Sequence, residues 1–236
     1  MARPYKRGMK TILIAAAVLA LAPATASAQS ARFVGYVEGK QVTTWEIPRH
    51  QHGVRDCKGA AFLAERGSET VRFRTRPARI RADRIGGYPA LKYGTWSRFA
   101  AGKPHLAATG TVTRTHDAVR DYEPGPCGAP PQPAPPVYDC GKRRYAPEVR
   151  LQWRGHTAFV AAAQPDLAFL SCPLRAATGI IEGDFTEIGE RYPVRELFDR
   201  RQGLVVVLGK RTYSEQLDFG GVTTTTITWK LRLRRR

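Results

Sequence analysis

The chain has 236 residues and a formal net charge of +18, from 38 lysines and arginines against 20 aspartates and glutamates. After one apolar stretch near the N-terminus no other stretch reaches the length of a membrane-spanning helix, which excludes a protein with several such helices. The positive charge favours anionic polymers as partners, but 29 of the 38 basic residues are arginine. A GC-rich genome also produces such a composition, so the charge leaves both explanations open.

Residues 1–28 are predicted to be a secretory signal. Arg3, Lys6, Arg7 and Lys10 form a basic region, Thr11–Leu21 is apolar, and Ala26-Ser27-Ala28 offers a cleavage site. An uncleaved membrane anchor is the alternative, disfavoured because the apolar segment is short and broken at Pro23. We therefore expect a mature chain of residues 29–236 that is secreted, extracellular or associated with the cell envelope, without stable membrane insertion.

In chain order, the first elements are strands. Arg32–Ile47 predicts two short strands joined at Glu38-Gly39, or one bent strand with a glycine bulge at Gly35 or Gly39. Pro48–Lys58 is irregular, and Gly59–Arg66 could form one or two helical turns. Thr70–Arg76 alternates cleanly, with Val71, Phe73 and Thr75 on the buried face. Gly110–His116 is a further strand by its β propensity.

Residues 121–137 are rich in proline and resemble a linker at first sight. We instead expect a surface crossover within a single domain, because Cys127 and Cys140 lie at the two ends of its proline run. An even number of cysteines in an exported chain indicates disulfides. Cys140 is predicted to pair with Cys172, which brackets a hairpin, and by exclusion Cys57 pairs with Cys127.

The second half continues the β pattern. It holds a hairpin at Glu148–Ala162, a short helix at Pro193–Arg201, a buried strand at Leu204–Leu208 and a long alternating strand at Val222–Arg234. Such a series of short strands with one helix predicts an all-β fold, an antiparallel β-sandwich or open barrel.

Two basic ladders are the main candidate binding feature. Alternate residues of a strand share one face at about 7 Å spacing, which suits a polyanion. The residues are Arg72, Arg74 and Arg76 in one segment and Lys230, Arg232 and Arg234 in the other. If both strands lie in one sheet, the ladders merge. The alternative to a binding face is an ordinary solvated face, because charged outer faces also prevent aggregation at sheet edges. Nucleic acid is disfavoured as a partner, because Phe73 and Trp229 point inward and leave no aromatic residues between the cations.

The sequence gives weaker evidence for a metal site or a catalytic site than for the basic ladders. His50 and His52, near Asp56, could reach a metal ion from an extended chain, but a solvated pair is the more common arrangement. The paired carboxylates Asp117 and Asp121, or Glu182 and Asp184, could serve a hydrolase. No nucleophile motif and no phosphate-binding loop is present, and we expect no cofactor.

The sequence therefore favours an exported, non-catalytic binding or structural protein of the cell envelope that contacts anionic polymer through its arginine-rich sheet face. A secreted hydrolase with an active site built from loops is the alternative. The sequence leaves the oligomeric state and the specific ligand open.

Overall fold

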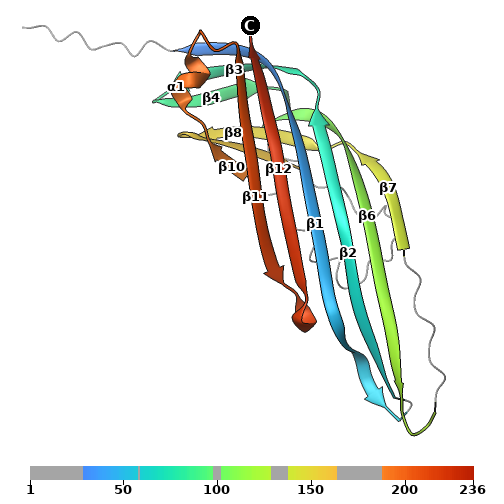
Figure 1. Ribbon diagram of the computed structural model, residues 1–236. Helices are drawn as coiled ribbons and strands as arrows, with labels where there is room; N and C mark the ends of the chain where they lie inside the picture. Colours follow the sequence, from blue (N-terminus) through green and yellow to red (C-terminus); the bar gives the residue numbers. More distant parts are fainter. Residues whose placement is uncertain (1–28, 58, 98–101, 129–137, 164–187) are drawn as a thin grey trace, which may run out of the picture.

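The computed structural model describes residues 29–57, 59–97, 102–128, 138–163 and 188–236. Within these residues twelve antiparallel strands form one sheet, and one short α-helix lies at its upper end (Figure 1). The predicted all-β fold with one short helix is confirmed. The sheet is open rather than closed into a barrel.

Five long strands form the front of the molecule in Figure 1: β1 (Ser30–Asp56), β2 (Gly59–Thr75), β6 (Pro104–Pro124), β11 (Leu204–Gln216) and β12 (Val222–Arg235). The shorter strands are β3 (Ala78–Ile85), β4 (Tyr88–Tyr93), β5 (Thr95–Trp96), β7 (Tyr138–Tyr145), β8 (Glu148–Arg154), β9 (Thr157–Ala162) and β10 (Ile188–Arg191). Helix α1 (Val194–Phe198) and a 3-10 turn (Asp218–Gly220) precede β11 and β12 respectively. The main path of the sheet is β10-β9-β8-β6-β2-β1-β12-β11, with β3 beside β1 and β4, and β5 and β7 beside β6.

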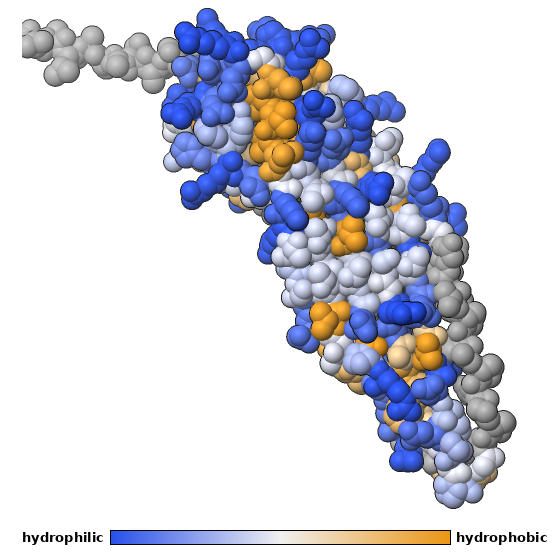
Figure 2. All heavy atoms as spheres, viewed as in Figure 1, coloured by the Kyte–Doolittle hydropathy of each residue, from blue (hydrophilic) through white to orange (hydrophobic). Residues whose placement is uncertain are grey.

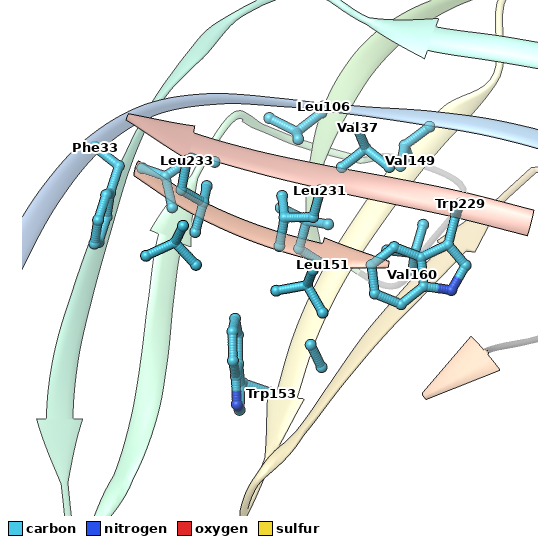
Figure 3. Packing of buried hydrophobic residues seen from close by; sticks show 14 of the residues in the cluster. Phe33, Val37, Leu106, Val149, Leu151, Trp153, Val160, Trp229, Leu231 and Leu233 are labelled. Atoms are coloured by element: carbon cyan, nitrogen blue, oxygen red, sulfur yellow. The ribbon is translucent and has the colours of Figure 1, made fainter. Parts of the chain in front are cut away.

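The hydrophobic core lies at the upper end, where β8 and β9 pass behind the long strands (Figure 1). Their apolar side chains pack against those of β1 and β12 (Figure 3). The residues in contact include Phe33, Val37, Leu151, Trp153, Val160, Trp229, Leu231 and Leu233. We call the face of the long strands that carries this core the inner face and the opposite one the outer face. Side chains alternate between the two faces because successive Cβ atoms of a strand point in opposite directions.

A row of alternating glycine and aromatic residues crosses the sheet at the lower edge of this core, to which Phe73 and Trp229 belong. Neighbouring strands are in register at these positions, which are Gly209, Trp229, Gly39, Phe73, Gly110 and Tyr145 from β11 to β7. A Cβ at Gly39 would lie 2.3 Å from the Phe73 ring, and one at Gly110 would lie 2.2 Å from the Tyr145 ring. Each glycine therefore makes room for the aromatic ring of a neighbouring strand. Gly39 lies at no bulge, in contrast to the sequence-based expectation, since β1 pairs with β2 and β12 in continuous register there.

We expect Gly39→Ala to lower the free energy of unfolding by about 1–3 kcal/mol, because the added methyl group must displace a buried ring. Urea denaturation followed by tryptophan fluorescence measures this change. Gly203→Ala is the matched control, since its Cβ would meet no atom within 4 Å. Equal stability of the two variants would contradict the steric role of Gly39.

Two segments predicted as irregular or helical are strand. Residues 48–56 continue β1, and residues 59–66 begin β2, where Leu63 lies opposite His50 of β1 and Arg120 of β6. The register shifts between Ile47 and His50, next to Pro48, which has no backbone donor for a regular ladder. Pairing with strands on both sides outweighs the local helical preference of residues 59–66.

The other elements follow the predictions more closely. The hairpin is β8–β9, and the helix is α1, with Val194 and Leu197 buried. The long C-terminal strand is β12, whose apolar set is buried as predicted. In the predicted buried strand Leu204–Leu208, however, only Val205 and Val207 are buried, because β11 has an outer face in contact with solvent.

Cys57 and Cys127 form a disulfide with a Cα–Cα separation of 5.4 Å, which is the pairing predicted for these two residues. Cys57 lies in the turn between β1 and β2, and Cys127 follows β6, the other neighbour of β2, so the bond ties the β1–β2 turn to the lower end of β6. Cys172, the predicted partner of Cys140, lies outside the described residues. Of the predicted proline-rich crossover, residues 121–124 belong to β6 and 129–137 lie outside the described residues.

Candidate functional site

The two predicted basic ladders lie on the same face of one sheet. Arg72 and Arg74 of β2 and Lys230, Arg232 and Arg234 of β12 occupy outer-face positions, and β1 separates the two strands. The two ladders therefore merge into one basic surface, as predicted for strands of the same sheet.

Strand β1 contributes side chains between the ladders. Glu38 lies opposite both Arg74 and Lys230, and Lys40 lies opposite Arg72. Neighbouring strands of a sheet are about 4.8 Å apart, so the cations form a two-dimensional array rather than a single line.

Tyr36 of β1 places an aromatic ring within this array. A guanidinium nitrogen of Arg232 donates a hydrogen bond of 3.2 Å to the Tyr36 hydroxyl, and the Arg74 guanidinium lies 4.4 Å from the centre of the ring. Phe73 and Trp229 do point inward, each with 3% of its surface exposed. Tyr36 was not among the residues predicted for this face, although it alternates in phase with Glu38 and Lys40 along the strand.

A groove of about 1170 Å³ crosses the sheet at the level of the glycine and aromatic row. Because the rings of Phe73 and Trp229 are buried, the backbone of this row forms the floor of the groove and outer-face side chains form its walls. Six basic residues line it, against Glu38 and Glu190: Lys40, Arg72, Arg74, Arg144, Lys210 and Lys230. Figure 2 shows the outer face, where blue side chains surround a paler band across its middle.

Carboxylates neutralise other parts of the surface but not the groove. Among the described residues, salt bridges join Arg49 to Asp121 and Glu123, Arg55 to Glu123, Arg66 to Asp117, and Asp83 to Arg81 and Lys92. In the part of the chain that the structure describes, no groove cation has a carboxylate oxygen within 4.0 Å of its charged group. Glu190 accepts a 3.4 Å hydrogen bond from the backbone amide of Lys210. The six groove cations therefore form no ion pair among the described residues, and they outnumber the two groove carboxylates, Glu38 and Glu190.

Arg76 and Arg235 have surroundings that differ from those of the groove cations. Arg76 is exposed just after the end of β2. Arg235 donates hydrogen bonds to the carbonyl oxygens of Leu197, Asp199 and Gln202, so it holds the C-terminal end of α1 instead of facing a ligand. A cation at this end of a helix also interacts favourably with its unpaired carbonyl groups.

The inner face carries a second group of charged residues, below the core. We call Glu65 and Glu69 of β2 and Arg114 and His116 of β6 the buried charge cluster. Arg114 Nε lies 3.7 Å from Glu69 Oε2, and His116 Nε2 lies 3.7 Å from Glu65 Oε2. Arg114 is 1% exposed, and its guanidinium nitrogens have no hydrogen-bond partner among the described residues.

Burial dominates the electrostatics of this cluster. It raises the pKa of the Glu69 carboxyl to about 7, although the Arg114 guanidinium acts in the opposite direction. Burial also lowers the pKa of the Arg114 guanidinium. It raises the pKa of the Tyr145 hydroxyl, and the negative charge of Glu69 raises that pKa further. The alternation could have revealed these residues, since Glu69 shares the parity of Val71, and Arg114 that of Val112.

The histidines predicted as metal-ligand candidates, His50 and His52, have other surroundings. His50 Nδ1 lies 3.1 Å from the Pro48 carbonyl oxygen and its ring stacks on Phe219 at 4.1 Å, while His52 is exposed. No group of three potential metal ligands occurs among the residues that the structure describes.

The carboxylates are also poorly placed for hydrolysis. Asp117 and Asp121 lie four residues apart on β6, or about 13 Å along a strand, whereas glycosidase pairs lie about 5–9.5 Å apart. Each is bound to an arginine, Asp117 to Arg66 and Asp121 to Arg49. Glu182 and Asp184 lie outside the described residues.

None of the helices in the described part of the chain has the length and apolar character needed to cross a membrane. Comparisons with protein-family models, curated proteins and solved structures find no match for this chain.

Proposed function

We propose that this protein is a non-catalytic binding protein of the cell envelope whose basic outer face binds an anionic polymer. The observation that carries the proposal is the groove, which gathers six cations from five strands, none of them in an ion pair with a described residue. The predicted signal sequence and the Cys57–Cys127 disulfide support an oxidising compartment outside the cytoplasm.

The array suits an extended chain with regularly spaced negative charges. Cations on one strand repeat at about 7 Å, and those on neighbouring strands at about 5 Å, so a polymer can contact several of them along more than one path. Each contact releases a counterion, which makes the affinity depend steeply on salt concentration. Arg74 and Arg232 are held against Tyr36, which reduces the side-chain entropy lost when they bind an anionic group.

The test is binding to polygalacturonate, an acidic polysaccharide, over a series of salt concentrations. Arg72→Gln/Arg74→Gln should weaken binding about tenfold and lower the slope of log affinity against log salt by about two, because two contacts are lost. Arg49→Gln/Arg66→Gln is the matched control, since it removes the same charge from arginines already bound to carboxylates.

We expect this control to bind within about twofold of the wild type, because paired surface cations contribute little. Equal losses in both variants would show that net charge alone drives binding, which would overturn the proposed site. Absence of binding at every salt concentration would overturn the proposed function.

A further inference from the structure

The outer face has an apolar stripe directly beside its cations. In β11, Leu204 is 49% and Leu208 63% exposed, and Val206 between them is partly exposed. Figure 2 shows this stripe as a continuous apolar patch near the upper end of the molecule. Strand β11 lies at the end of the strand order, so the patch borders an edge of the sheet.

Each residue of the stripe lies opposite a cation of β12 on the same face. The pairs are Leu204 with Arg234, Val206 with Arg232, and Leu208 with Lys230. On the far side of β12, Val34 and Tyr36 of β1 lie opposite Arg234 and Arg232. The surface is therefore amphipathic across the strands, with aliphatic groups next to a row of cations.

The charge indicates what covers this stripe. Exposed aliphatic residues on an edge strand favour association with another surface. Pairing with a second copy of the chain would bring two cationic rows together, and like charges facing each other oppose such contact. An anionic partner with apolar groups satisfies both parts of the surface.

We propose that this amphipathic surface contacts an anionic lipid membrane, with the side chains of Leu204 and Leu208 entering the boundary between headgroups and acyl chains. Lys230, Arg232 and Arg234 then contact lipid phosphates, and Tyr36 has the amphipathic character suited to this boundary. The protein lies on the membrane surface and does not span it. The inference rests on the proposed function in that the β12 cations serve both contacts.

Vesicle co-sedimentation tests the inference, with protein expressed from the full sequence so that residues 1–28 are treated alike in all variants. We expect binding to vesicles of phosphatidylcholine mixed with phosphatidylglycerol to exceed binding to phosphatidylcholine alone by about tenfold. Leu204→Ser/Leu208→Ser should weaken binding to the anionic vesicles about tenfold. Leu204→Ser alone, at a position outside the groove, should weaken vesicle binding and leave polygalacturonate binding unchanged. Arg232→Gln/Arg234→Gln should weaken vesicle binding by a similar factor.

Val119→Ser/Val222→Ser is the control, because it removes two exposed aliphatic side chains that lie elsewhere. Polygalacturonate binding without binding to anionic vesicles would overturn this inference and leave the proposed function intact. Equal vesicle binding by the serine variants of the stripe and of the control would also overturn it. Self-association of the wild type that Leu204→Ser/Leu208→Ser abolishes would assign the stripe to a second copy of the chain and overturn the lipid contact.

Discussion

The Glu69→Gln variant should be more stable than the wild type at pH 8 and should lack a pH dependence that the wild type shows. In the folded protein burial raises the pKa of Glu69 to about 7 from an ordinary value of 4.5. Between these values the folded state holds a proton that the unfolded state has lost, so stability falls as the pH rises. The integrated loss is about 3 kcal/mol, and it is complete above the folded pKa.

Urea denaturation at intervals from about pH 5 to about pH 8 gives the free energy of unfolding of the wild type and of Glu69→Gln. Arg114→Met provides an internal check, because it removes the cation that lowers the pKa of Glu69. We expect the wild-type decline to shift to higher pH in this variant. Parallel curves for the wild type and Glu69→Gln would show that the carboxyl titrates as it does in water.

Removal of the Cys57–Cys127 disulfide should lower the free energy of unfolding by about 4 kcal/mol, from the entropy of closing a loop between residues 70 positions apart. The Cys57→Ser/Cys127→Ser variant removes the bond with little change in side-chain volume. Its loss should also free the lower ends of β1 and β6, where the Cys127 amide donates a 2.9 Å hydrogen bond to the Cys57 carbonyl oxygen.

Urea denaturation measures the stability loss, and hydrogen exchange locates its structural effect. Amides near Cys57 and Cys127 should exchange faster, whereas those of Ile227 and Leu231 in the core should change only with global stability. An unchanged free energy of unfolding would contradict the stabilising role of this bond.

The sequence predicted those strands whose two faces differ in polarity. In β12 the apolar residues Ile227 and Leu231 alternate with Thr228 and Lys230, and only a half-buried strand explains such a pattern. The lower parts of β1 and β2 lack this contrast, because Glu65 is buried there while Phe62 is only partly buried. Alternation of polarity therefore could not identify them as strands.

The candidate site was predictable in part for the same reason. Alternation placed Arg72 and Arg74 on an outer face, but it could not show that β1 lies between β2 and β12. That neighbourhood depends on long-range pairing, and it brings Tyr36 and Lys40 into the cationic array. The groove likewise depends on the register of the glycine and aromatic row, which no single strand reveals.

Lysine acylation followed by mass spectrometry tests most directly whether the groove is the polymer-binding site. Lys40, Lys210 and Lys230 line the groove, whereas Lys92 is bound to Asp83 and Lys103 is exposed outside it. With polygalacturonate bound, acylation of the three groove lysines should slow about fivefold or more, while Lys92 and Lys103 should react as in the free protein. Equal protection of all five lysines, or protection of Lys92 and Lys103 alone, would contradict polymer binding in the groove.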